Sequence, residues 1–182
     1  MLTLVESNAI DVITLSEVKA HLRLDTDVED DLLNNLISAA TNLVEEYLGK
    51  TLIKKTWRLV DEGVDVDGLL EITLPRGPLL KVLAVQRVLP NDTFMNIRFT
   101  VQNHYAKPII VCRPFDLVSV LYEAGYGYYP KEVPSPIRQA LLTLVSFFYE
   151  NRSGQMALPP LVKTLLSPFT AIQIYTHPKP KF

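Results

Sequence analysis

Apolar residues recur every three or four positions from residue 28 to residue 48, which predicts a long helix with one broad apolar face. Val28 is the first residue of that face. Asp27 is the expected N-cap, because a short acidic side chain can accept hydrogen bonds from the free amides of the first turn. Gly49 stands where the helix is expected to end in a left-handed conformation.

Two other segments are predicted to be helical. Residues 15–22 follow Thr14, and Thr14 and Glu17 have the spacing of a capping box, in which each side chain bonds the backbone amide of the other residue. Residues 137–152 follow Pro136, a residue type that is common in a first helical turn. Apolar and aromatic side chains surround much of this last helix, so we expect it to be buried on more than one side.

Between these helices the pattern changes to short runs rich in valine, isoleucine and aromatic residues. The runs are separated by glycine, proline and asparagine, which favour turns, and together they predict a small antiparallel β-module. The segment 61–68 is acidic and contains glycine, so a loop is expected there. The expected strands are 51–60, 69–74, 81–89, 94–101, 109–112 and 118–124.

The order of helices, strands and helices predicts an α+β fold. The N-terminal helices and the long C-terminal helix are expected to form a small helical bundle, with the antiparallel β-module inserted between them. On this interpretation, residues 1–50 and 131–174 are the two parts of the helical domain. Residues 51–130 are the inserted β-module, and 175–182 are an extended tail.

Charge is distributed unevenly along the chain. Residues 1–50 carry ten acids and three bases, a local charge of −7, whereas residues 51–182 carry ten acids and fifteen bases, a local charge of +5. Opposite charge at the two ends of a protomer would orient copies of the chain toward one another. The alternative is that the asymmetry is incidental charge on solvated faces.

The sequence offers few parts for catalysis, and neither a cofactor nor a metal is expected. Cys112, the single cysteine, lies in an apolar run and is expected to be buried. His21, His104 and His177 have no metal-type spacing to another ligand. The acids of segment 25–31 resemble a cation-binding loop but lack its glycine and distal glutamate, so helix capping explains them better. We therefore predict that the chain is not an enzyme.

Membrane and nucleic-acid functions are also disfavoured. No apolar run approaches the roughly 20 residues that span a bilayer, and the N-terminus lacks the pattern of a signal peptide. Bases and aromatics mix at Lys54, Lys55, Trp57 and Arg58, which raises the question of nucleic-acid binding. The net charge of −2 argues against a dedicated binder, since such proteins usually carry a strongly basic face.

Three segments, in this order and spacing, resemble the phage head–tail connector (adaptor) family in its longer form with an inserted β-region. The runs that carry the resemblance are Thr14-Leu15-Ser16-Glu17-Val18, with Tyr47-Leu48-Gly49-Lys50, then Leu74-Pro75-Arg76-Gly77-Pro78-Leu79, then Ala124-Gly125-Tyr126-Gly127, with Val133-Pro134-Ser135-Pro136 and Phe148-Tyr149-Glu150-Asn151-Arg152. Segment 91–116 carries no match. The family commonly has an arginine after the aromatic residue near its end, whereas this chain has Pro168-Phe169-Thr170. A contact made by that arginine is therefore not implied here.

The resemblance implies a structural role in the virion neck of a tailed bacteriophage, after synthesis in the bacterial host cytoplasm. Such proteins form a homo-oligomeric ring, expected to be twelvefold, below the portal protein. The ring extends the DNA channel and presents a platform to a downstream neck or tail-completion protein, while DNA passes without specific recognition. The alternatives are another neck component (a stopper or tail-completion protein), an enzyme with an unrecognised site, or a nucleic-acid-binding module.

Two groups of residues are candidates for contacts in such an assembly. The oligomer interface is predicted to use aromatic residues near the end of the last long helix and the base that follows them, namely Phe147, Phe148, Tyr149 and Arg152. The C-terminal tail is predicted to order on the portal, and its candidate residues are Tyr175, Lys179, Lys181 and Phe182. A terminus without a partner is the alternative for the tail.

Overall fold

The computed structural model describes the chain except residues 8–9, 92, 105–106, 152–157 and 171–182, and except the side chains of 103, 104 and 107. The helices are α1 (Leu15–Leu22), α2 (Asp30–Leu48), α3 (Ser135–Glu150) and α4 (Pro160–Leu166), with 3-10 turns η1 (Pro130–Glu132) and η2 (Ser167–Phe169). The strands are β1 (Leu2–Ser7), β2 (Lys55–Asp61), β3 (Val64–Val66), β4 (Leu69–Thr73), β5 (Leu79–Leu89), β6 (Thr93–Asn96), β7 (Phe99–His104), β8 (Lys107–Cys112) and β9 (Val118–Ala124).

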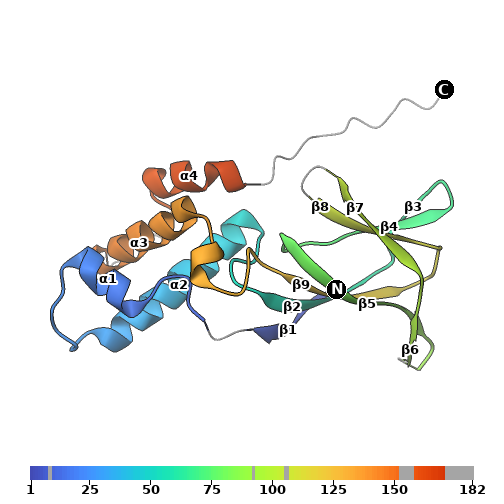
Figure 1. Ribbon diagram of the computed structural model, residues 1–182, viewed down its shortest axis with the longest axis horizontal. Coiled ribbons are helices and arrows are strands. Elements are labelled where there is room, and N and C mark those ends of the chain that lie inside the picture. Colours follow the sequence, from blue (N-terminus) through green and yellow to red (C-terminus); the bar gives the residue numbers. More distant parts are fainter. Residues whose placement is uncertain (8–9, 92, 105–106, 152–157, 171–182) are drawn as a thin grey trace.

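The predicted fold class is confirmed, because two antiparallel sheets are inserted between N-terminal and C-terminal helices. The helices form one end of an elongated molecule, and the sheets form the other (Figure 1). Each end has its own apolar core.

The helical core forms because α2 and α3 turn their apolar faces toward each other. Leu33, Ile37, Ala40 and Val44 of α2 are buried against an apolar stripe of α3. The buried residues of that stripe are Ile137, Ala140, Leu141, Leu144 and Val145. α1 and α4 complete the bundle through Val18 and Val162, both fully enclosed. Hydrophobic burial of these stripes is the main stabilising contribution, since helices of this length are marginal alone.

The β-module is a sandwich of two sheets. The larger sheet has the order β1-β2-β9-β5-β6, and the smaller has the order β3-β4-β8-β7. Their facing sides enclose Leu59, Val85, Val120 and Tyr122 from the larger sheet and Ile72, Ile110 and Cys112 from the smaller one. Cys112 is thus buried as expected, and burial raises the pKa of its thiol.

The start of the long helix differs from the prediction. Glu29 is the N-cap of α2, without a side-chain capping bond, and Asp27 lies before it in the α1–α2 loop. Asp27 accepts instead from Lys19, 2.5 Å away, and this bond lowers the pKa of Asp27. Val28 is also outside the helix, with its side chain 90% exposed rather than on the buried face.

Three features of the strands were wrong or missed. The single strand expected over 94–101 is two strands, β6 and β7, which belong to different sheets. The expected loop 61–68 contains the short strand β3. The N-terminal strand β1 was not expected at all, and it forms an edge of the larger sheet by pairing with β2.

Candidate functional site

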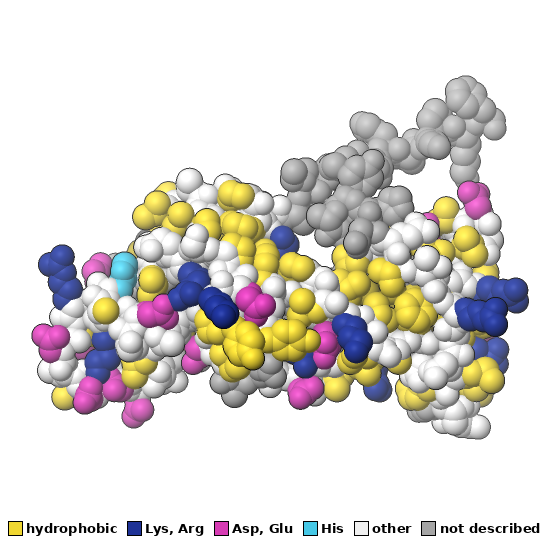
Figure 2. Space-filling model, viewed as in Figure 1, with side chains coloured by type: hydrophobic (Ala, Val, Ile, Leu, Met, Phe, Trp, Pro, Cys, Tyr) yellow, Lys and Arg dark blue, Asp and Glu magenta, His cyan; other side chains and the backbone are white. Residues whose placement is uncertain are grey.

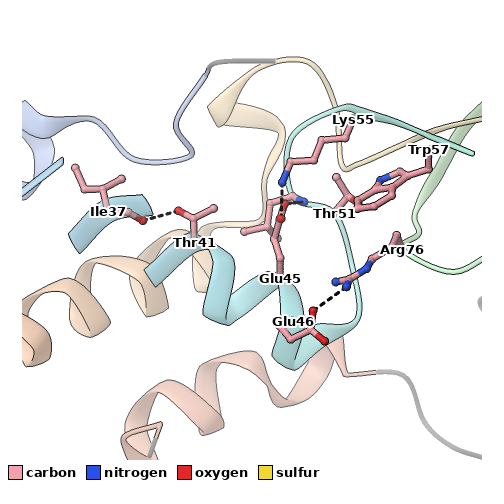
Figure 3. Close-up of polar contacts among 9 residues, drawn as sticks. Ile37, Thr41, Glu45, Glu46, Thr51, Lys55, Trp57 and Arg76 are labelled. Carbon is pink, nitrogen blue, oxygen red and sulfur yellow. Dashed lines mark hydrogen bonds and ion pairs between the residues drawn. The ribbon is translucent and has the colours of Figure 1, made fainter. Parts of the chain in front are cut away.

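The helical end and the sandwich are joined at Glu45, a buried carboxylate near the end of α2. Its Oε1 accepts from the backbone amide of Leu52 at 2.9 Å, and its Oε2 accepts from Lys55 Nζ at 2.5 Å. The carboxylate therefore holds both the linker 49–54 and the first residue of β2 against the helix (Figure 3). A buried charge is tolerated here because both of its oxygens are bonded.

Arg76 makes a second link between the two ends. Its guanidinium bonds Glu46 Oε2 of α2 at 2.7 Å and lies over the Trp57 ring, 5.6 Å from the ring centroid (Figure 3). The Trp57 indole donates to Thr51 Oγ1 at 3.0 Å, and the Thr51 amide donates to the carbonyl of Arg76 at 3.2 Å. The loop between β4 and β5 is thereby tied to the end of the helical bundle.

The linker is also held from its other side by the segment after β9. The Lys54 amide donates to the Gly127 carbonyl at 2.8 Å, and the Tyr126 amide donates to the Leu52 carbonyl at 3.0 Å. Gly125 has φ +147°, and a Cβ there would lie 2.7 Å from the Lys54 nitrogen, so only glycine fits. Paired on both sides, the linker fixes the orientation of the sandwich relative to the helices.

A largely enclosed salt bridge reinforces this linker. Lys54 Nζ lies 2.9 Å from Glu123 Oε1 of β9, and the hydrogen bond raises the pKa of Lys54. The ammonium group also lies 5.6 Å from the centroid of the Tyr128 ring. The mixed aromatic and basic residues near β2, which raised the question of nucleic acid, thus serve internal contacts.

The predicted interface residues of α3 lie together at its C-terminal end. Phe147 and Phe148 are half-buried against the helical core, with ring centroids 6.3 Å apart. Tyr149 donates its hydroxyl to Glu29 Oε2 at 2.5 Å, so it links α3 to the start of α2. Arg152 and the tail residues Tyr175, Lys179, Lys181 and Phe182 lie outside the described residues.

The described residues provide little for catalysis or metal binding. Among them, no group of three or more His, Cys, Asp or Glu side chains could hold a metal ion. A surface pocket of 180 Å³ lies beside Glu45 and Lys55, but both of these charged groups are engaged by the linker. A shallower hollow of 470 Å³ lies beside Glu17, Tyr129 and Arg138, where Glu17 and Arg138 pair with each other.

Part of the sequence is similar to a family of phage proteins. Residues 12–85, from the approach to α1 through the first half of β5, match the phage gp6-like head-tail connector protein family. Over these residues the chain is similar to a structural connector family. No curated protein matches the chain at a significant level.

The chain also shares its fold with chains in solved gene transfer agent (GTA) particles. One, in the neck of an empty GTA particle computed with C6 symmetry, has a TM-score of 0.81 and 24% identity, covering 97% of this chain and 98% of that chain. A chain in the virion of a native GTA particle has a TM-score of 0.77 and 24% identity, with the same coverage. A chain in the neck of a native GTA particle computed with C12 symmetry has a TM-score of 0.74 and 23% identity, covering 96% and 98%.

The family match covers residues 12–85, whereas the likeness of fold covers nearly the whole chain. Within the residues that the structure describes, no helix is long and apolar enough to cross a membrane. The sequence does not predict the contacts around Glu45 and Arg76, although Leu74-Pro75-Arg76-Gly77-Pro78 is one of the segments that resemble the connector family. The sequence does contain one signal for these contacts. The loop that carries Arg76 is stiffened by two prolines, and α2 ends close to two acids, Glu45 and Glu46.

Proposed function

We propose that this chain is a head–tail connector, the adaptor of a tailed phage or phage-like particle, and forms a homo-oligomeric ring directly below the portal protein. The family match over residues 12–85 carries the proposal. The shared fold with chains from GTA necks, two of them computed with C6 and C12 symmetry, supports a ring, and we propose twelve subunits. In this position the ring extends the DNA channel of the virion neck. The protein would be made in the host cytoplasm before it joins the virion.

A closed ring requires one interface repeated by a constant rotation. Each protomer must therefore present two different, complementary faces and keep them at a fixed angle. The linker 49–54, held by Glu45 on one side and by Gly127 on the other, supplies such rigidity. A protomer that flexed at this point would give an ensemble of rotations, and few of them would close.

Two contact surfaces belong to this proposal. The α3 end with Phe147, Phe148 and Tyr149, together with Arg152, contributes to the contact between subunits. The tail, through Tyr175, Lys179, Lys181 and Phe182, orders on the portal. Aromatic residues are enriched among the residues that dominate binding at interfaces, which favours both choices.

The opposite surface of the ring would be the platform for a downstream neck or tail-completion protein. DNA would pass through the ring without specific recognition, because the chain has a net charge of −2 and lacks the basic excess of a dedicated binder. A filter-binding assay should then find only weak DNA affinity at physiological salt.

The decisive experiment is ordered assembly with the cognate portal. Purified portal is mixed with this connector alone, and the complex is isolated by sedimentation and imaged by negative-stain electron microscopy. We expect a twelvefold ring on the portal in the absence of other neck proteins. A stopper or tail-completion protein, the alternative, would bind only after another adaptor had been added, and that order would reject our proposal.

A further inference from the structure

The sandwich is open along one side, where its interior reaches the surface. Phe99 and Val101 of β7 pair directly with Cys112 and Ile110, so they share the inner face of the smaller sheet. Side chains directly opposite each other in an antiparallel pair lie on the same face. Nevertheless Phe99 is 40% exposed and Val101 is 41% exposed.

The larger sheet contributes a matching residue to the same opening. Met95 of β6 pairs with Arg87 of β5, and Arg87 pairs with the buried Val118, so Met95 also faces the interior. Met95 is 55% exposed. Residues 97–98 carry the chain directly from β6 to β7, which brings the two sheet edges together at this corner. Met95, Phe99 and Val101 therefore form an apolar opening, here called the sandwich mouth.

Basic side chains surround the sandwich mouth. Arg98 and Arg113 are exposed. Arg98 immediately precedes β7 and Arg113 immediately follows β8, so each lies one residue beyond the Phe99–Cys112 pair. Arg87 lies over the Phe115 ring, 5.7 Å from its centroid, at the same opening. Figure 2 shows Lys and Arg side chains gathered over this end of the molecule.

The other end of the molecule presents the complementary surface. In the α1–α2 loop, Val28 is almost wholly solvent-exposed, as noted above, and acids flank it on both sides. Lys19 pairs with both Asp27 and Asp30 and offsets one of their two charges, while Asp25 and Asp31 are exposed. Figure 2 shows Asp and Glu side chains concentrated at this end. The loop is thus an apolar tip within an acidic rim.

We propose that the sandwich mouth receives the α1–α2 loop of a second copy of this chain, as one lateral contact of the ring. Val28 of one protomer contacts Met95, Phe99 and Val101 of its neighbour, while Asp25 and Asp31 face Arg98 and Arg113. The two surfaces are different and lie at opposite ends of the molecule, as a repeating heterologous contact requires. The inference rests on the proposed ring, which it deepens by naming the contacting residues.

The division of labour in this contact follows general rules for interfaces. The apolar tip and mouth remove hydrophobic surface from water, which supplies affinity. The charged rims steer the approach and reject the reverse orientation, in which acids would meet acids. Because the rims are solvent-exposed, the contact should weaken as salt is raised.

Cross-linking of full-length variants tests this contact. Val28→Cys and Met95→Cys proteins are prepared separately, mixed, and treated with a short bis-maleimide. We expect covalent heterodimers in the mixture, little product from either variant alone, and a ladder from the double variant. Wild type is the control for Cys112, whose burial should keep it unreactive.

Charge reversal tests the same contact independently. Asp25→Lys/Asp31→Lys and Arg98→Glu/Arg113→Glu should each weaken ring assembly on the portal by at least about tenfold at low salt, because like charges then face each other. A mixture of the two variants should recover ring assembly, because opposite charges face each other wherever one variant lies beside the other. A protein with all four changes should assemble like wild type. Circular dichroism checks that each variant folds.

The possible failures are distinguishable. Rings that assemble without the Val28–Met95 cross-link, or that ignore both charge reversals, would overturn this contact and leave the proposed ring intact. A wild-type protein that neither forms rings nor binds the portal would overturn the proposed function, and the contact with it.

Discussion

At the scale of single residues, neighbouring aromatics on α3 have different tasks. The Tyr149 hydroxyl donates to Glu29 Oε2 at 2.5 Å and so links α3 to the start of α2 inside the bundle. Phe147 makes no such polar bond and is only half-buried against the helical core. A substitution at Tyr149 would therefore disturb folding and assembly together. A substitution at Phe147 can affect assembly while leaving the fold intact.

Phe147→Asp should give a folded protein that no longer forms rings. Removal of an aromatic contact residue commonly costs about 2 kcal/mol or more of binding free energy, which corresponds to roughly thirtyfold weaker association. Size-exclusion chromatography with light scattering measures the oligomer, and circular dichroism reports the fold. Because Phe147 also packs inward, Phe147→Leu serves as a milder second variant that keeps this packing.

Val64→Asp is the matched control for that experiment. It also places a carboxylate on an exposed apolar position, 65% accessible on β3, far from α3. Rings are expected to persist in this control. If they persisted equally in Phe147→Asp, the α3 end would not be part of the subunit contact.

At the scale of elements, α1 shows how a local signal fixes a helix. Thr14 and Glu17 form the predicted capping box, with the Glu17 amide donating to Thr14 Oγ1 at 3.2 Å and the Thr14 amide donating to Glu17 Oε2 at 2.8 Å. The backbone bond from Thr14 is the largest cause of a lowered pKa at Glu17, and Arg138 of α3 adds to it. One carboxylate thus starts α1 and attaches it to α3.

Glu17→Gln should flatten the acid dependence of stability. Since the pKa of Glu17 is lowered on folding, its contribution is present above the ordinary carboxyl range and is lost as pH falls through the folded pKa. Urea unfolding at pH 7 and pH 3 should show a smaller loss for Glu17→Gln than for wild type. Thr14→Ala, which removes only the hydroxyl acceptor, should cost about 1 kcal/mol at pH 7.

Glu62→Gln, at an exposed position in the β2–β3 turn, is the control for the loss of one carboxylate. Its pH dependence should follow wild type. Identical curves for Glu17→Gln and Glu62→Gln would show that the cap carboxylate does not contribute to acid sensitivity.

Local patterns predicted some elements well and others poorly. The capping box and helical periodicity gave the bounds of α1, and the turn residues around β4 and β9 bracketed those strands. The run 94–101 was expected to be one strand, because nothing in it marks residues 97–98 as the crossing between sheets. β1 went unnoticed because its position depends on pairing with β2, about fifty residues later in the chain.

At the scale of the whole molecule, the two apolar cores are joined most closely around the short linker 49–54, which is hydrogen-bonded on both sides. The sequence predicted both cores and the resemblance to the connector family, since each depends on periodicity or on short runs. It did not predict how the cores are joined, because the contacts of Glu45, Thr51, Trp57 and Arg76 bring together separate segments of the chain. The same limit applies to the sandwich mouth, whose exposure depends on how far one sheet overlaps the other.

The last prediction concerns the C-terminal segment 175–182. Deleting residues 175–182 should weaken portal binding while leaving the thermal unfolding midpoint unchanged, because the deletion keeps every described residue of the two apolar cores. A tail that orders on its target contributes affinity only in the complex. Surface plasmon resonance against immobilised portal measures the loss, and a protein with residues 175–182 in scrambled order distinguishes sequence from mere length. Equal portal affinity for wild type and deletion would dismiss the tail, whereas a matching loss in Lys179→Glu/Lys181→Glu would assign its contribution to charge.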